Sequence, residues 1–542
     1  MATAQRPWHV YGGARRCSGS GGGGGGRRAV CLALCFALWL MAGAGGVGAV
    51  GSSPARVAAV AGCTVTTTLD VGPGSLRQAI TDANSGVCAS PITFAIGTGA
   101  QTIDVMGSLP PLTLTTGAGI TIDGTTQPGY VAAGAPLITV NRSLGGVTGI
   151  TLFTVNAGVT VHLTALTVQN TVTGAIKNAG TLTVADSVIQ NNLSDKPGAG
   201  IFNNAGTLTV TGSTLAVNES LGSDGGAIGM VGGTTTVRSS LLTGNIAFGG
   251  NGSGIAMAGG TLIVDRSTLT ANTQANTGGG IYTRVNGIGI NAAPTLYVTN
   301  STLSGNAAFG GGGGIYAETS TVATFTNATI TANTTTTNPG NGGGLYFAGT
   351  SATLANTIIA GNSVASGSAG PDIFAGNIID LGHNVIGKTD GTPGGTFANA
   401  TDYTGTILML RDPGLVPLAN NGGPTPTHAL LGSSVAVNHG DPTICANTGG
   451  IAPVGGLDQR GVHRPQGAAC DIGAFEYFKL AILGGTLPTS GGVVTLTGTG
   501  FQPGLTLTIA GTPVPVLAVS SDGTGLTARA RARIRHRHRR YQ

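Results

Sequence analysis

The chain has 542 residues, of which 8% are charged and 4% are aromatic, while 97 are glycine. So few charged, helix-forming residues argue against a helical repeat protein. The formal net charge of +5 comes from arginines near the two ends of the chain, and the body between them is neutral to acidic, so we expect no nucleic-acid binding.

Residues 1–50 predict a secretory leader. The apolar run Ala29–Met41 follows Arg27 and Arg28 and precedes a stretch rich in glycine and alanine, which is typical of a signal peptide. A membrane anchor is the alternative, because no charge occurs from residue 29 to residue 50. We therefore expect an exported protein, secreted or held at the cell surface, that contacts a membrane only if the leader is not cleaved.

Four cysteines follow the leader: Cys63, Cys88, Cys445 and Cys470. Pairing within each end of the chain is the simplest arrangement, and each disulfide would then close a loop of about 25 residues and contribute about 3 kcal/mol. A metal site is the alternative, but no pair has the short C-x-x-C spacing of zinc ligands. The sequence thus predicts two disulfides, no metal site and no cofactor.

From residue 164 to residue 374 the chain repeats one unit, which is too short to fold as a domain. Each unit closes with two small residues followed by Ile or Leu, at Ile176, Ile201, Ile228, Ile255, Ile281, Ile315 and Leu345. An Asn three residues after an apolar residue recurs in step, at Asn192, Asn218, Asn245, Asn272, Asn306, Asn333 and Asn362. Such a repeat means one supersecondary unit stacked on its own copies. The longest unit contains extra residues, 284–291, which predict an inserted loop.

The unit is made of strands. Segments such as Thr207–Val210 and Thr261–Val264 alternate polar with β-branched or apolar residues, a period of two that indicates β-structure. With glycine-rich turns between them, these strands predict an all-β fold and a parallel β-helix over residues 131–400. The recurring Asn has two interpretations: it accepts the left-handed conformation and hydrogen-bonds its copies in neighbouring coils, or it forms a polar stripe for a sugar or an ion.

Carbohydrate-cleaving chemistry on such a fold would need carboxylates that converge on one bond or on a cation such as calcium. The repeats from residue 181 to residue 362 contain six acids, Asp186, Asp195, Glu219, Asp224, Asp265 and Glu318. None recurs at the same place in its unit, so calcium has no pattern to support it. Asp195 and Asp224 could meet on adjacent coils and are the candidate catalytic pair.

Carbohydrate binding without cleavage has a different candidate set. Tyr282, Tyr316 and Tyr346 each follow the closing Ile or Leu of a unit, so an outward stripe of rings could contact sugars. The alternative is a solvent-facing strand side filled by β-forming residues. Two further polar groups are expected to satisfy turns and caps rather than perform chemistry: Asp372, Asp380, His383, Asp390 and Asp402, and Asp458, Arg460, His463 and Asp471.

The segments that flank the repeats are recognisable. Ser75–Ile80 and Thr121–Tyr130 resemble the opening segments of bacterial cell-surface β-helix proteins with pectin-lyase-like repeats. Asn421–Leu430 and Cys470–Glu476 resemble the choice-of-anchor-type module that closes such proteins. The resemblance covers about residues 63–477 and implies a right-handed parallel β-helix, capped at both ends, on a secreted or surface-attached protein. Independently, Leu76–Asn84 has helical spacing and is expected to cover the first coil.

The sequence pattern changes after Tyr477. Ile482–Gly492 and Val493–Phe501 resemble the start of an immunoglobulin-like IPT/TIG domain, and their alternating strands predict a partial β-sandwich. Residues 529–542 are dense in Arg and His and are expected to be a disordered tail, with binding of a polyanion as the alternative.

The expected organisation is then a leader (1–50), an N-terminal cap with the first coils (63–130), a β-helix (131–400), a closing module (401–477), a partial sandwich (478–528) and a basic tail (529–542). The expected function is that of a non-enzymatic adhesive or structural module, with a polysaccharide or cell-surface glycan as its partner. A polysaccharide lyase or glycoside hydrolase, and a passive stalk that presents the C-terminal domain, are the alternatives.

Overall fold

The computed structural model describes residues 62–114, 117, 119–142, 151–285, 293–391, 397–478, 481–485, 492–499, 507–509, 512–520 and 525–530. The expected leader, most of the inserted loop at 284–291, and residues 531–542 of the expected basic tail lie outside these ranges. None of the helices described is long and apolar enough to cross a membrane.

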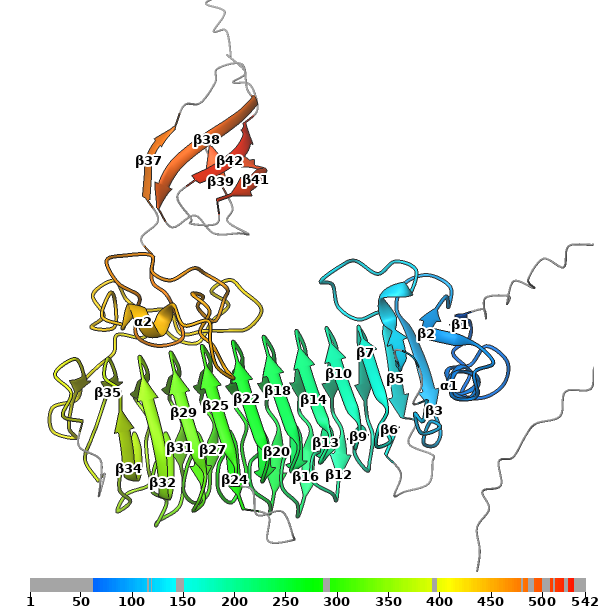
Figure 1. Ribbon diagram of the computed structural model, residues 1–542, viewed down its shortest axis with the longest axis horizontal. Helices are drawn as coiled ribbons and strands as arrows, with labels where there is room; N and C mark the ends of the chain where they lie inside the picture. The colour runs from blue at the N-terminus through cyan, green and yellow to red at the C-terminus, as the bar shows by residue number, and fades with distance from the viewer. Residues whose placement is uncertain are drawn as a thin grey trace, which may run out of the picture. The chain divides into compact units, whose positions relative to one another are not determined.

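A parallel β-helix forms the body of the chain, as the repeats predict (Figure 1). Sheet 1 contains β1 (Gly62–Val65), β2 (Ala89–Phe94), β4 (Ile120–Asp123), β7 (Thr160–Thr164), β10 (Thr181–Ala185), β14 (Thr207–Thr211), β18 (Thr234–Arg238), β22 (Thr261–Asp265), β25 (Thr295–Thr299) and β29 (Val322–Thr326). Sheet 2 contains β3 (Gln101–Val105), β5 (Ile138–Arg142), β8 (Leu166–Gln169), β11 (Val188–Gln190), β15 (Thr214–Ala216), β19 (Leu241–Thr243), β23 (Thr268–Thr270), β26 (Thr302–Ser304), β30 (Thr329–Thr331), β33 (Ile358–Ala360), β35 (Val385–Ile386) and β36 (Tyr403–Thr404).

Sheet 3 completes the coil. It contains β6 (Phe153–Val155), β9 (Ile176–Asn178), β13 (Ile201–Asn204), β17 (Ile228–Val231), β21 (Ile255–Ala258), β24 (Ile281–Arg284) and β28 (Ile315–Ala317). Two long strands run from sheet 3 into sheet 1, β32 (Leu345–Ala355) and β34 (Ile373–Asp380). Two small sheets lie along the chain between sheets 2 and 3. One contains β12 (Leu193–Ser194), β16 (Glu219–Leu221) and β20 (Ile246–Phe248), and the other contains β27 (Ala307–Ala308) and β31 (Thr334–Thr335).

The register places like residues on top of one another. Val210 pairs with Val184 in the preceding coil and with Val237 in the next, and all three are fully buried. Because the inward residue repeats at each level, one continuous apolar core extends from the N-terminal cap to β35. The alternation of the sequence is thus the alternation between this core and the outer surface.

The N-terminal end is closed by α1 (Leu76–Ser85), as the helical spacing predicts. Ser75 caps the helix by accepting a hydrogen bond from the backbone N–H of Gln78 at 3.2 Å, and Gly86 ends it in the left-handed conformation. The apolar face that the helix buries over the first coil consists of Leu76, Ala79, Ile80 and Ala83. A 3-10 turn, Gly124–Thr126, follows β4.

The closing module folds back along the outer side of sheet 2. Thr302 donates to Gln459 at 2.6 Å, and the backbone N–H of Ala474 donates to Thr329 at 3.0 Å. The module contains little regular structure besides β36 and α2 (Pro442–Cys445). Its polar contacts therefore run from the middle of the β-helix toward its C-terminal end.

The C-terminal residues form an antiparallel sheet that fits a partial β-sandwich. Its strands are β37 (Ala481–Gly485), β38 (Gly492–Thr499), β41 (Val516–Val519) and β42 (Gly525–Ala530), with the hairpin β39 (Leu507–Ile509) and β40 (Thr512–Val514). A small core of its own supports it. Strand β42 extends through Arg529, so the first residues of the expected tail are part of the sheet.

Candidate functional site

The recurring asparagines lie inside the coil. Asn245 is typical: its side-chain amide donates to Asn272 at 2.9 Å and to the carbonyl of Leu215 at 3.0 Å, and its backbone N–H donates to the same Asn272 oxygen at 3.1 Å. All seven are at most 1% exposed. The left-handed residue is the one before each Asn, such as Ala271, rather than the Asn itself. The asparagine ladder is therefore a stack of buried hydrogen bonds, not a surface stripe for a ligand.

The first and last asparagines of the ladder have hydrogen-bond partners other than asparagine. The first member, Asn192, accepts from the hydroxyl of Thr171 at 3.0 Å. The last member, Asn362, donates its backbone N–H and its side-chain amide to Asp372 at 2.8 and 2.9 Å. A carboxylate accepts without needing to donate further, which suits the last position. The other oxygen of Asp372 is buried without a hydrogen-bond partner among the described residues, and burial raises the pKa of this carboxyl to about 6.

Acidification is expected to stabilise the fold through Asp372. Because its pKa lies above the ordinary 3.8, folding favours the protonated form. That stabilisation is complete below about pH 4 and is lost as the pH rises through 6. We therefore expect the wild type to gain about 2 kcal/mol of stability relative to Asp372→Asn when the pH falls from 7.5 to 4. Thermal unfolding at both pH values measures this, and a difference that does not change with pH would contradict it.

Four aromatic rings stack on the outer side of sheet 3, and we call them the aromatic stripe: Tyr282, Tyr316, Tyr346 and Phe374. Tyr316 and Tyr346 have centroids 4.5 Å apart and planes 5° apart, and Tyr346 and Phe374 are 5.1 Å and 7° apart. Tyr282 leans on Tyr316 at 5.8 Å and is only 5% exposed. The tyrosines do face outward in consecutive coils, but each stacked ring covers the face of the next. The stripe therefore presents ring edges, whereas sugars stack on open faces.

Polar groups fix one end of the stripe. The hydroxyl of Tyr282 donates to Glu318. Burial, and then the nearby Glu318 carboxylate, raise the pKa of Tyr282 well above its usual range. Burial also raises the pKa of Tyr316 to about 12. Both rings therefore carry neutral hydroxyls at any physiological pH.

The two candidate catalytic carboxylates have separate partners. They stand in the same turn of adjacent coils, because Ser194 pairs with Ser220 and the backbone N–H of Gly198 donates to the carbonyl of Asp224 at 3.1 Å. Asp195 forms an exposed ion pair with Lys196 at 3.1 Å. Asp224 pairs instead with Arg284 at 3.5 Å. Each of the two carboxylates is thus balanced by a different cation.

A depression of about 500 Å³ lies on the same outer side, toward the N-terminal coils. It is lined by Phe202, Lys177, Asp195, Lys196 and Pro197, among others, and we call it the Phe202 depression. Its volume is within the range of ligand sites. Phe202 follows the closing Ile of its unit, as the tyrosines follow theirs, so the repeat contained the signal for it. A smaller depression of about 20 Å³ also has Pro197 in its lining.

Phe202 differs from the aromatic stripe in its neighbours. In register it stands between Lys177 and Gly229, and neither residue has a ring to cover it. Phe202 is partly exposed. This part of sheet 3 thus combines a partly exposed ring with ammonium, carboxylate and hydroxyl groups.

The polar groups near the C-terminal end serve the fold, as expected. Asp380 accepts from the backbone N–H of Gly382 at 2.9 Å and from the side chain of Asn384 at 3.0 Å. Asp402 accepts from the backbone N–H of Asn384 at 2.7 Å. Burial, with the adjacent Asp380, raises the pKa of Asp402 to about 7. His383 contacts the carbonyl of His439 at 2.7 Å, which ties the last coil to the closing module.

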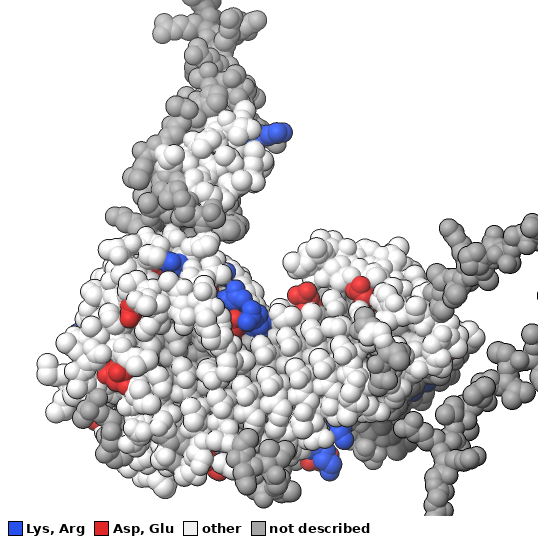
Figure 2. Space-filling model, in the orientation of Figure 1, with Lys and Arg blue, Asp and Glu red and all other residues white. Residues whose placement is uncertain are grey.

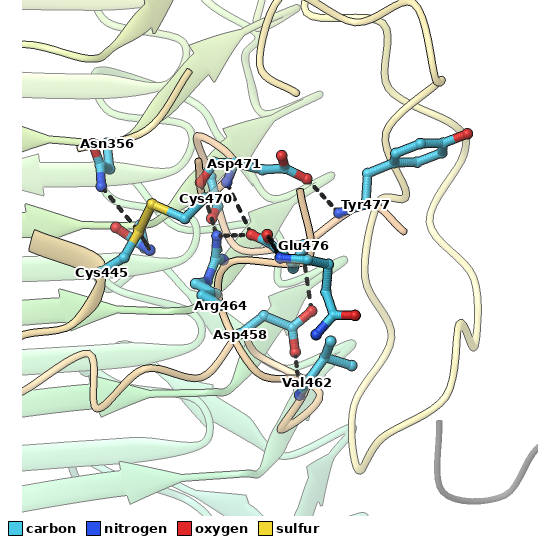
Figure 3. A network of polar contacts seen from close by, with 12 residues as sticks. Asn356, Cys445, Asp458, Val462, Arg464, Cys470, Asp471, Glu476 and Tyr477 are labelled. Atoms are coloured by element: carbon cyan, nitrogen blue, oxygen red, sulfur yellow. Dashed lines mark hydrogen bonds and ion pairs between the residues drawn. A yellow bond between two sulfur atoms is a disulfide. The ribbon is translucent and has the colours of Figure 1, made fainter. Parts of the chain in front are cut away.

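A buried network of charges holds the closing module together (Figure 3). Arg464 and Glu476 form an ion pair at 3.0 Å, and both side chains are fully buried. Glu476 also accepts from the backbone N–H of Asp471 at 2.9 Å. Asp458 pairs with Arg460 at 2.7 Å. Burial, and then the Glu476 carboxylate, raise the pKa of Asp471 to about 7. These groups organise the module.

Both disulfides form with the predicted pairing, Cys63 with Cys88 and Cys445 with Cys470. Two disulfides indicate an oxidising, extracytoplasmic environment. Among the residues with a described position, no group of three or more His, Cys, Asp or Glu side chains could hold a metal ion. No family model matches the chain, and no curated protein matches its sequence. The fold is a disulfide-bonded parallel β-helix followed by a partial β-sandwich.

Proposed function

We propose that this protein is an exported, surface-displayed β-helix that acts as a non-enzymatic adhesive or structural module and contacts carbohydrate at the Phe202 depression. The observation that carries the proposal is the partly exposed ring of Phe202, which lines a depression of about 500 Å³. A sugar ring can stack on such an aromatic face while its hydroxyls bond the surrounding polar groups. Lys177, Lys196 and Asp195 supply donors and an acceptor there.

The charge pairing on this side of the coil supports binding over cleavage. Glycoside hydrolysis needs two carboxylates that flank one bond. Asp195 and Asp224 are instead each engaged by a neighbouring cation. A lyase or hydrolase on the same fold remains the alternative function.

Display outside the cell rests on separate observations. Two disulfides favour an oxidising compartment. The apolar run after Arg27 and Arg28 is typical of a secretory leader. The end segments at 75–80 and 470–476 resemble those of bacterial surface proteins. Together they support a surface module that carries a further C-terminal domain.

Binding to a panel of immobilised plant and microbial polysaccharides, with calcium present, tests the proposal. We expect the wild type to be retained without release of cleavage products, and Phe202→Ala to weaken retention about three- to tenfold. Phe248→Ala is the matched control, because Phe248 is a similarly outward ring, 55% exposed, on a different strand.

Three outcomes would contradict the proposal. Products that disappear with Asp195→Ala or Asp224→Ala would identify an enzyme. Equal retention of Phe202→Ala and Phe248→Ala would place the contact elsewhere. No retention on any polysaccharide would favour the passive stalk.

A further inference from the structure

Three charged residues, Arg238, Asp265 and Arg266, lie together at the edge between sheets 1 and 2. Arg238 and Asp265 end β18 and β22 and are paired in register. The residues at the same level in neighbouring coils are Ala185, Thr211, Thr299, Thr326 and Ala355. Arg238 and Asp265 thus occupy a position that these five coils fill with small neutral residues, although β4 ends in Asp123 at the same level.

Arg266 is equally out of pattern. It occupies the turn position after the strand with a φ of 48°, a conformation that favours Gly, Asn and Asp. The other coils have glycine or a short side chain there: Ala165, Asp186, Gly212, Ser239, Asn300, Asn327 and Asn356. A long basic side chain gains nothing from this turn geometry, so its presence points to a role for the guanidinium.

Both arginines converge on one oxygen. The Oδ2 atom of Asp265 lies 3.3 Å from Nε of Arg238 and 3.5 Å from Nε of Arg266. The Asp265 side chain is 7% exposed, while the arginine side chains are 46% and 25% exposed. Two guanidinium groups carry ten N–H donors between them, far more than one shared carboxylate oxygen can accept. The cluster has a net charge of +1 and surplus donors at the surface.

The closing module packs directly beside this cluster. The hydroxyl of Thr425 donates to the carbonyl of Arg266 at 3.4 Å, and Thr268 donates to the carbonyl of Pro426 at 2.6 Å. Arg266 therefore lies at the foot of the module and Arg238 one coil away from it. Figure 2 shows Lys and Arg side chains beside the module on a face otherwise poor in charge. Asp186 lies on the same edge two coils further, in the turn after β10.

We propose that Arg238 and Arg266 form a binding site for the tetrahedral oxyanion of an ester, a sulfate or phosphate group on a polymer. A carboxylate has two oxygens and matches one guanidinium fork. A tetrahedral ester has three terminal oxygens and can accept from two guanidinium groups that approach from neighbouring coils. Asp265 positions the two arginines by holding their Nε atoms. This site is independent of the Phe202 depression and of the proposed contact with neutral sugar groups.

The test measures binding of the full chain to dextran sulfate, phosphorylated dextran, carboxymethyl dextran and unsubstituted dextran at about 0.15 M salt, where weak non-specific attraction is screened. We expect binding to one or both tetrahedral esters, weaker binding to the carboxylate polymer and none to the parent. Which ester binds more tightly distinguishes sulfate from phosphate as the source. Carboxymethyl dextran that binds as tightly as either ester would overturn the proposal.

Variants locate the site. The double substitution Arg238→Gln with Arg266→Gln is expected to weaken binding about tenfold or more, and the double substitution to lysine, which keeps the charge, several-fold. Arg284→Gln is the matched control, because Arg284 is a half-exposed arginine paired with one carboxylate on another side. The basic residues of 529–542 contribute equally to all of these proteins. Equal binding of the double glutamine variant and the wild type, or an equal loss with Arg284→Gln, would contradict the site.

A competition experiment on the wild type needs no variant. Inorganic sulfate or phosphate should displace the polymer at concentrations where sodium chloride of the same ionic strength does not. Displacement by both salts in proportion to ionic strength alone would mean diffuse attraction and would refute a built site.

Discussion

Asn272→Ala is expected to lower the free energy of unfolding by about 4 to 6 kcal/mol. The substitution removes four hydrogen bonds: two accepted from the backbone and side chain of Asn245, and two donated to the carbonyl of Leu242 and to Asn306. All of these groups are buried, so the partners left behind have no water to replace the lost bond. Equilibrium unfolding in urea, followed by circular dichroism, measures the loss.

The matched control lies four residues further along the same coil. Asn276 is exposed, and its side chain makes a single bond to the carbonyl of Gly249 at 2.9 Å. Asn276→Ala should cost less than about 1 kcal/mol, because water replaces that bond. Similar losses for the two variants would mean that the asparagine ladder contributes no more than a surface bond, contrary to its geometry.

The repeated part of the fold could be predicted because every coil buries the same kinds of residues at the same positions. Ile228 and Ile255 pair in register as the repeat implies, and Asn218 bonds Asn245 as expected of stacked copies. The helix at 76–85 could be predicted because its apolar spacing lies within one short segment. The two disulfides could be predicted because each end of the chain after the leader contains two cysteines that can pair locally.

Features that depend on unequal turns could not be predicted in the same way. Counting back from the closing Ile predicts that Asp195 and Asp224 meet on adjacent coils. The two turns differ in length, because Ser194 pairs with Ser220 while Gly198 bonds the carbonyl of Gly225, so the closeness of the two carboxylates stays a prediction. The aromatic stripe has a similar limit: the spacing shows that Tyr316 and Tyr346 face outward, yet only geometry shows that their ring faces cover each other.

Long-range partners were also beyond the sequence. Asp372 ends the asparagine ladder although it belongs to the turn that precedes β34, ten residues after its partner Asn362. The closing module has a recognisable motif, but the motif does not reveal that Gln459 contacts Thr302 and Thr268, more than a hundred residues away. Such contacts arise from the fold-back of a loop-rich segment that has no period of its own.

Arg464→Met is expected to detach the closing module without unfolding the β-helix. The arginine donates to Glu476 at 3.0 Å and to the carbonyls of Asp471 and Gly473 at 2.8 and 2.6 Å. Methionine fills a similar volume but leaves the Glu476 carboxylate buried without its cation. Removing one partner of a buried pair costs about 3 to 5 kcal/mol. Lys196→Met, which breaks the exposed pair with Asp195, should cost about 1 kcal/mol or less.

Hydrogen exchange can locate that loss. The backbone N–H groups of Gly473 and Ala474 bond Asn356 and Thr329 across the boundary between module and sheet 2, so they should lose protection in Arg464→Met. The N–H of Asn272, inside the coil, should keep its protection. A uniform loss at all three positions would mean that the module and the β-helix unfold as one unit.

The pH dependence of Arg464→Met separates charge from packing. Burial raises the pKa of both Glu476 and Asp471, so the fold favours their protonated forms and the stabilisation from protonation is lost as the pH rises through these raised values. At low pH the two carboxyls are neutral and no longer need the guanidinium. The cost of Arg464→Met should therefore shrink between pH 7.5 and pH 4.5. A cost that stays constant would assign the role of Arg464 to its hydrogen bonds with backbone carbonyls rather than to its charge.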